Sequence, residues 1–168
     1  MTVMEAIKGR KSIRSYDSKP IEPEKITAVM EAARLAPSAR NRQMWKFIVV
    51  TDAELKDKLL DACNGQQFVK QAPAAIIACG EAPGVMACGQ PVETVDTCIA
   101  LSFVMLKAYE EGLGTCWLGN FNQEKVKAVA NIPDDVVVVA VTPLGYPAEI
   151  PDARPRKAFD EVISYNKY

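Results

Sequence analysis

The chain has 168 residues, 49% of them hydrophobic, which suits one domain with a sizeable core and is too short for two. Its formal net charge of −1 excludes the broad basic face that general nucleic-acid binding requires. The absence of histidine excludes histidine-dependent triads and most zinc hydrolase sites, and we expect no metal site. If the chain is an enzyme, we expect its reactive atoms to belong to a bound cofactor.

The termini and cysteines indicate the compartment. No basic leader precedes an apolar run, and the longest apolar stretch, Ile99 to Ala108, is interrupted by Ser102 and Lys107, so we expect no membrane association and a cytoplasmic location. The five cysteines lack the paired spacing of zinc or redox sites, and we interpret most of them as small buried residues. Cys88 is the thiol that we expect to be most accessible.

The first half of the chain alternates predicted helices with short strands. Thr2 and Glu5 have the spacing of a capping box, and Asp52 is a typical N-cap residue before a run of leucines at helical spacing. The elements expected here are a helix from Thr2 to about Gly9, a helix from Pro23 that ends before Pro37, a strand at Lys46–Thr51, a helix from Asp52 to Asn64-Gly65 and a buried strand at Ala74–Cys79.

The second half contains the longest predicted helix, Val92 to about Glu111. Its apolar residues cover more of the circumference than one core face requires, which favours a partner subunit as additional cover. The other features expected here are a Gly- and Pro-rich loop at Gly80–Pro91, a short strand at Thr115–Leu118, a helix from Asn122 to about Ala130, a strand at Val136–Val141 and an extended arm at Tyr146–Pro155.

Two cationic clusters stand out in a nearly neutral chain. Arg10-Lys11-Ser12-Ile13-Arg14 follows the first helix directly, and Arg154-Pro155-Arg156-Lys157 lies near the C-terminus. Guanidinium groups match phosphate oxygens in geometry and charge, so the two clusters could close on one phosphate. The alternative is that both runs are solvated surface, as charge runs usually are.

Several motifs, in this order, resemble the FMN-dependent nitroreductase family over nearly the whole chain. The resemblance implies an α+β fold with a mostly antiparallel sheet flanked by helices, in one domain over residues 1–168, and a homodimer with FMN at the subunit interface. The long helix would lie at that interface. The motifs are Arg10–Tyr16, Ala36-Pro37-Ser38-Ala39-Arg40-Asn41-Arg42-Gln43-Met44-Trp45, Gly112–Gly119, Leu144–Pro147 and Arg154–Lys157.

The resemblance also implies which residues hold the cofactor. The first cluster would bind the FMN phosphate and ribityl end, with Lys11 at a position where the family usually has arginine, and the C-terminal arm would assist. The loop at Pro37–Gln43 would approach the flavin from the neighbouring subunit. The backbone at Leu118 and Gly119 would lie beside flavin N5. The implied cofactor-binding set is Arg10, Lys11, Ser12, Arg14, Pro37, Ser38, Ala39, Asn41, Gln43, Leu118, Gly119, Arg154 and Arg156.

Two of these segments have simpler interpretations. The Pro37–Gln43 run could be an ordinary turn after a helix. Gly112 and Gly114 could simply end a helix and form a turn, whether or not Gly119 approaches the flavin. The family pattern is also incomplete, because Met44 stands where proline commonly precedes the tryptophan. Because the chain is near the short end of the family, we expect it to lack the helical insertions that cover the flavin in longer members. Gly80–Pro91 is then the main candidate cover for the flavin.

The implied function is that of an oxidoreductase with no catalytic side chain. NADH or NADPH would pass a hydride to flavin N5, and a nitroaromatic, quinone or related small acceptor would then be reduced at the same face. The alternatives on this scaffold are a dehalogenase-type enzyme or a flavin-consuming enzyme. A non-enzymatic FMN carrier or sensor is a further alternative, which failure of both nucleotides to bleach the flavin would support.

Overall fold

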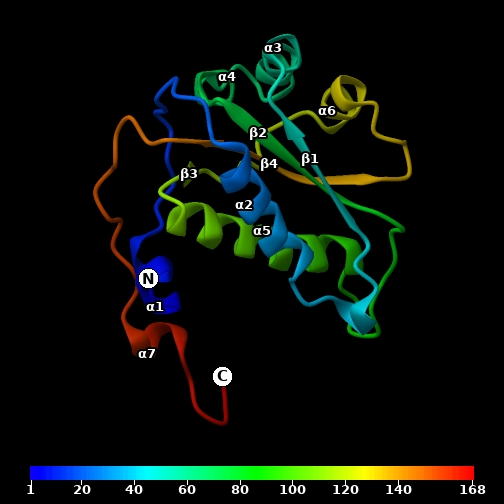
Figure 1. The fold of residues 1–168 in the computed structure, drawn as a ribbon. Coiled ribbons are helices and arrows are strands. Elements are labelled where there is room, and N and C mark those ends of the chain that lie inside the picture. The colour runs from blue at the N-terminus through cyan, green and yellow to red at the C-terminus, as the bar shows by residue number, and fades with distance from the viewer.

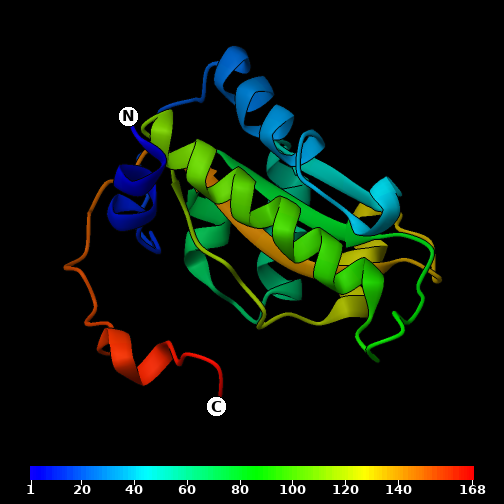
Figure 2. The ribbon, with the colours of Figure 1, turned by 90° about the horizontal axis from the view of Figure 1, so that it is seen from below.

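The computed structural model describes residues 1–168 and has an α+β fold in three layers (Figures 1 and 2). A four-stranded sheet in the order β1-β2-β4-β3, with antiparallel neighbours, forms the middle layer. This confirms the expected fold class. The strands are β1 Trp45–Val50, β2 Ala74–Gly80, β3 Gly114–Thr115 and β4 Val137–Gly145. The helices are α1 Val3–Gly9, α2 Pro23–Arg34, the 3₁₀ helix η1 Ala39–Asn41, α3 Ala53–Ala62, α4 Gln67–Gln71, α5 Val92–Glu110, α6 Gln123–Ala130 and α7 Phe159–Val162.

Strand β2 lies at the centre of the fold because both of its faces are covered. Every residue of β2 is buried. Since successive side chains of a strand point to opposite faces, Ile76 packs with α2 and α5, and Ile77 packs with α3, α4 and α6. A strand covered by helices on both sides reads as a continuous apolar run, which is why it was predictable from the sequence.

The helix starts that depend on local capping are confirmed. Thr2 and Glu5 form the reciprocal capping box at the start of α1. Asp52 accepts the N–H of Leu55 at the start of α3, and Asn122 caps α6 in the same way. Gly112, with φ +76°, follows the end of α5 in the left-handed conformation that favours glycine at this position.

Some element boundaries differ from those expected. Strand β3 ends at Thr115, and Leu118 meets β4 only through one isolated bridge to Val141, so the expected strand at Thr115–Leu118 is too long. Strand β4 continues to Gly145, beyond the expected end at Val141, because its last residues pair with β2 and β3. The short helices α4 and α7 were not expected, since four or five residues are too few to show a helical period.

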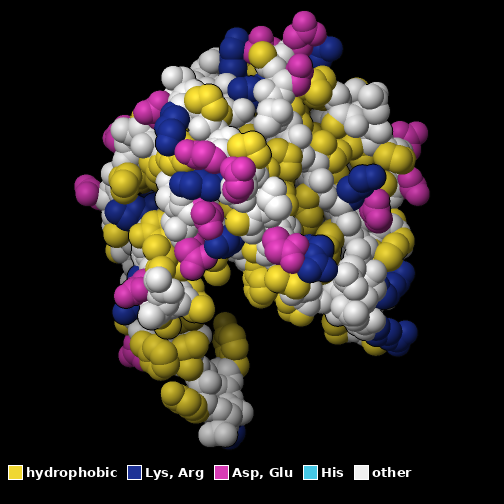
Figure 3. All heavy atoms as spheres, in the orientation of Figure 1, with side chains coloured by type: hydrophobic (Ala, Val, Ile, Leu, Met, Phe, Trp, Pro, Cys, Tyr) yellow, Lys and Arg dark blue, Asp and Glu magenta, His cyan; other side chains and the backbone are white.

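Two apolar surfaces lack a covering element within the chain. The outer side of α5 carries a partly exposed stripe of Val95, Ile99, Phe103 and Leu106, at helical spacing. The C-terminal segment from residue 148 onward is exposed throughout and forms an extended arm that ends in α7, well away from the sheet (Figures 1 and 3). Figure 3 shows apolar side chains gathered on this arm, where the exposed residues are Ile150, Phe159, Val162, Ile163, Tyr165 and Tyr168.

None of the helices is both long enough and apolar enough to cross a lipid bilayer. The cysteines mostly follow the expectation. Cys63, Cys79 and Cys116 are buried, whereas Cys88 is exposed in the loop between β2 and α5. Burial raises the pKa of the Cys63 thiol to about 12, which makes this side chain an inert packing residue at neutral pH.

Candidate functional site

The two cationic clusters, 140 residues apart in sequence, line one pocket. Its volume is about 490 Å³, and it lies where the segment after α1 faces the C-terminal arm. Both terminal segments can be followed side by side in Figures 1 and 2. The structure thus brings together the sequence-predicted phosphate residues within a single chain. The polar and charged residues of the pocket are Lys8, Arg10, Lys11, Ser12, Arg14, Asp152, Arg154 and Arg156.

Strand β3 positions the first cluster. The N–H of Ile13 donates to the carbonyl oxygen of Thr115 (2.9 Å), and Ser12 forms a parallel bridge with the same residue. Ile13 is buried, and Gly114 makes room for it, because a Cβ at Gly114 would lie 2.6 Å from the Ile13 side chain. Tyr16 donates its hydroxyl to the Ile13 carbonyl (2.8 Å). The buried residue anchors the segment, so the neighbouring cations are held at the pocket.

The pocket has a strong net positive charge. None of its lysines or arginines takes part in an ion pair of the chain. Asp152 is the only acid among the lining residues. The positive charge of the pocket also acts on the nearby Cys116 thiol. Burial raises the pKa of Cys116, and the charges of Arg14 and Arg10 oppose that rise. Unpaired guanidinium groups around a concave surface are the arrangement that binds phosphate.

The loop at Pro37–Gln43 lies at the opposite end of α5. It contains η1 and three residues in the left-handed region, namely Arg40, Asn41 and Gln43, with φ of 53°, 54° and 53°. The Ser38 hydroxyl accepts the N–H of Gln43 (3.0 Å), and the Gln43 amide donates to Asn41. The loop is therefore a compact, internally bonded structure and more than a simple turn.

Leu118 and Gly119 form a third group, in the segment that follows β3. Leu118 is buried and exchanges backbone hydrogen bonds with Val141 of β4 (3.0 and 3.2 Å). The following segment is also held, because Gln66 donates to the carbonyl of Asn120 (3.1 Å). A Cβ at Gly119 would meet no atom within 4 Å, so nothing in the chain's own packing requires glycine there.

A single chain keeps the cationic pocket and the Pro37–Gln43 loop apart. Gly9, next to the pocket, abuts Tyr109 near the C-terminal end of α5, whereas Ala39 bonds to Asp96 near its N-terminal end. Asp96 and Tyr109 are 13 positions apart on α5, which corresponds to about 20 Å at 1.5 Å per residue. One chain therefore supplies two separate parts of the predicted cofactor set and does not join them.

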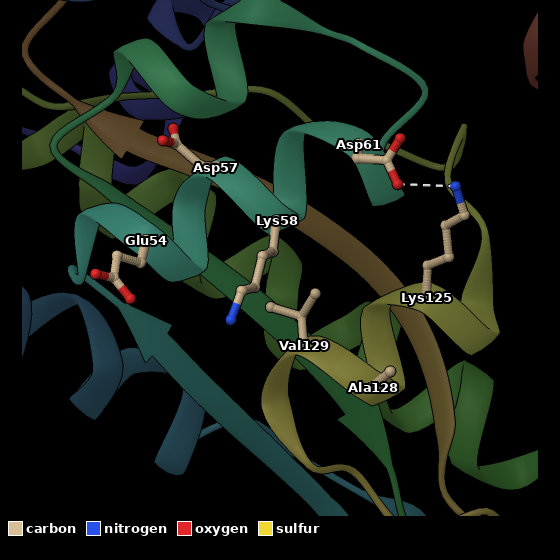
Figure 4. A pocket seen from close by; sticks show the side chains of 7 residues that line it. All are labelled: Glu54, Asp57, Lys58, Asp61, Lys125, Ala128 and Val129. Atoms are coloured by element: carbon tan, nitrogen blue, oxygen red, sulfur yellow. Dashed lines mark hydrogen bonds and ion pairs between the residues drawn. The ribbon is translucent and has the colours of Figure 1, made fainter.

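A cleft of about 700 Å³ lies elsewhere, between α3 and α6 (Figure 4). It is lined by both signs of charge, and Lys125 pairs with Asp61 across it (2.8 Å). It is shallow and solvent-facing, and its acids and lysines offset each other. We therefore place the functional site at the cationic pocket, despite its smaller volume. The cleft residues are Glu54, Asp57, Lys58, Asp61, Lys125, Ala128 and Val129.

The fold is an α+β sheet covered by helices on both faces, with a cationic pocket between the two terminal segments. Comparisons with known proteins identify the family. The Nitroreductase family profile matches residues 7–146, so the chain belongs to this family and is an oxidoreductase. A nitroreductase family protein from Clostridium novyi NT is 36% identical, with a TM-score of 0.83 over 89% of this chain and 87% of that one.

Two further similarities extend the match to the whole chain. A nitroreductase family protein from Clostridium difficile 630 is 31% identical, with a TM-score of 0.91 and full coverage of both chains. The FMN reductase [NAD(P)H] of Bacillus subtilis is 27% identical over 99% of this chain and 74% of its own length. The expected family is thereby confirmed. The roles of the individual site residues stay predictions.

Proposed function

We propose that the chain is an FMN-dependent oxidoreductase that uses NADH or NADPH to reduce nitroaromatic, quinone or related small acceptors. The observation that carries this proposal is the pocket lined by Arg10, Arg14, Arg154 and Arg156, none of which forms an ion pair within the chain. The name of the Bacillus subtilis relative, an FMN reductase that uses NAD(P)H, supports the same cofactor and donor.

The residues present fit a flavin mononucleotide. Arg10, Arg14 and the arginines of the arm would hold the phosphate, since charge-assisted hydrogen bonds must replace the hydration of a dianion. The Ser12 hydroxyl adds a donor at the same pocket. The open space at Gly119 allows a flat ring to approach the backbone. When bound, FMN supplies a ring that accepts a hydride from reduced nicotinamide and passes it to an acceptor.

The complete site is proposed to form in a homodimer. The Pro37–Gln43 loop lies about 20 Å along α5 from the phosphate pocket of its own chain, so a second copy would supply the loop at each site. The apolar stripe of α5, with Phe103 at 40% exposure, and the unattached arm are the surfaces that such a partner would cover. Two equivalent sites per dimer follow from the two-fold symmetry.

The visible absorption spectrum of the purified protein tests the proposal. We expect a flavin spectrum, with about one FMN released per chain on denaturation, and bleaching under anaerobic conditions by NADH or NADPH. Addition of nitrobenzoate or benzoquinone should then restore the oxidised spectrum. A protein that binds no added FMN would overturn the proposal. A protein that binds FMN but is bleached by neither nucleotide would instead be a carrier or sensor.

Gly119 provides a substitution that separates folding from cofactor binding. Because a Cβ there meets no atom of the chain, Gly119→Ala should change the melting temperature of the apoprotein by no more than a few degrees. If the backbone contacts the flavin ring, the added methyl group should weaken FMN binding by about tenfold, a loss of about 1.4 kcal/mol. Fluorescence titration with FMN measures this effect, and unchanged affinity would remove Gly119 from the site.

A further inference from the structure

Two buried carboxylates at the beginning of α5 each hold a loop. Asp96 is 3% exposed, and both of its oxygens accept the backbone N–H of Ala39 (3.2 and 3.1 Å), 57 residues away in sequence. Glu93 is 6% exposed, and its Oε2 accepts the N–H of Gly84 (3.1 Å). The helix start therefore ties down both the Pro37–Gln43 loop and the loop between β2 and α5.

Neither carboxylate has the partner that a buried charge usually requires. No ion pair of the chain involves Glu93 or Asp96. The backbone N–H groups of the two loops are therefore their main donors, assisted by the favourable dipole at the beginning of a helix. Buried acids without a cation are costly, and apolar residues would fill the same space at less cost. An apolar residue in either position could not accept the backbone N–H of a loop, and this hydrogen bond is what the two carboxylates add.

Both loops also hold backbone conformations that need support. Arg40, Asn41 and Gln43 in the first loop and Ala82 in the second have positive φ, although none is a glycine. Such residues keep a left-handed conformation only where surrounding contacts impose it. The tether from Asp96 attaches directly before the first strained segment, and the tether from Glu93 attaches two residues after Ala82.

We propose that Asp96 and Glu93 are positioning residues with separate tasks. Asp96 sets the loop that contacts FMN, through the Ala39 N–H, and Glu93 sets the loop that borders the acceptor, through the Gly84 N–H. The inference rests on the proposed function, because it assigns the two loops to cofactor and acceptor. The side chains touch neither ligand and act only through the backbone.

Asp96 is tested by removing the same hydrogen bond from each side. Asp96→Ala deletes the acceptor. Ala39→Pro deletes the donor at the first position of a short helix, where proline is tolerated. Each change should raise the FMN dissociation constant about tenfold or more, and Asp96→Asn, which keeps an amide oxygen as acceptor, should restore it to within about threefold. Retained affinity in both Asp96→Ala and Ala39→Pro would overturn the role of Asp96.

The role of Glu93 is tested by comparing the KM for the acceptor with the dissociation constant for FMN. Glu93→Ala should raise the KM for nitrobenzoate about tenfold while the FMN dissociation constant stays within about twofold, and Glu93→Gln should restore the KM. The control is Thr97→Val, because Thr97 is fully buried on the same helix and donates its hydroxyl to the carbonyl of Cys79 within strand β2, so it bonds to neither loop. If all three positions changed the same parameters equally, general weakening of α5 would explain them and the proposal would fail.

Hydrogen exchange separates this inference from the proposed function. The Ala39 amide should be protected in the wild type and exposed in Asp96→Ala, and the Gly84 amide should respond only to Glu93→Ala. These signals require no flavin. A wild type that binds no FMN but shows both selective responses would remove the proposed function and leave the two tethers established. Wild-type FMN binding without the responses would remove the tethers alone.

Discussion

Replacement of both Arg10 and Arg14 by alanine should give a folded but colourless protein. Each arginine is expected to donate a charge-assisted hydrogen bond to the FMN phosphate, and each such bond contributes about 1.5–3 kcal/mol. Each single change should therefore weaken FMN binding by about 10- to 150-fold, and the double change by at least about 10²-fold. Equilibrium titration of the apoprotein with FMN, followed by flavin fluorescence, measures the loss.

The stability of this double variant should change little. Neither guanidinium group forms an ion pair or a hydrogen bond within the chain, and the buried anchor of the segment is the apolar Ile13. The matched control is Arg34→Ala, which removes an arginine that pairs with Glu31 on the exposed side of α2 (2.6 Å). That surface pair contributes little, so the control should retain FMN. Undiminished FMN affinity of the double variant would refute the phosphate assignment.

The features that the sequence predicted are those decided by neighbours in the chain. Thr2, Asp52 and Asn122 each cap a helix through a residue three positions ahead, and all three were recognised from type and spacing. The apolar run of β2 likewise identified a strand covered on both faces. Local chemistry and periodicity are sufficient for such elements.

The features that escaped prediction depend on distant contacts. Asp96 was not singled out from the sequence, because its partner Ala39 is 57 residues away and offers only a backbone N–H. Arg40 and Gln43 of the Pro37–Gln43 loop are left-handed although their residue types rarely are, so their conformation could not be predicted from their types. The meeting of the two cationic clusters was suggested by charge alone, whereas their common pocket depends on the path of the arm.

Phe103→Glu should dissociate the proposed homodimer into monomers and, in the same step, remove the proposed flavin. Phe103 lies in the apolar stripe on the outer side of α5 and is 40% exposed in the isolated chain. A carboxylate at that point is solvated in a monomer but buried without a partner in a dimer, which costs several kcal/mol. We expect the dimer dissociation constant to rise at least about 10³-fold, measured by sedimentation over a dilution series.

The loss of flavin in this variant distinguishes a shared site from a site within one chain. Phe103 is not among the pocket residues, and the chain keeps its cationic pocket when it is monomeric. The Pro37–Gln43 loop, however, stays about 20 Å along α5 from that pocket, so a monomer lacks one part of the cofactor set. Ala128→Glu, which adds the same charge on the exposed side of α6, should leave both dimer and flavin intact. A Phe103→Glu monomer that binds FMN as tightly as the wild type would show that one chain is sufficient.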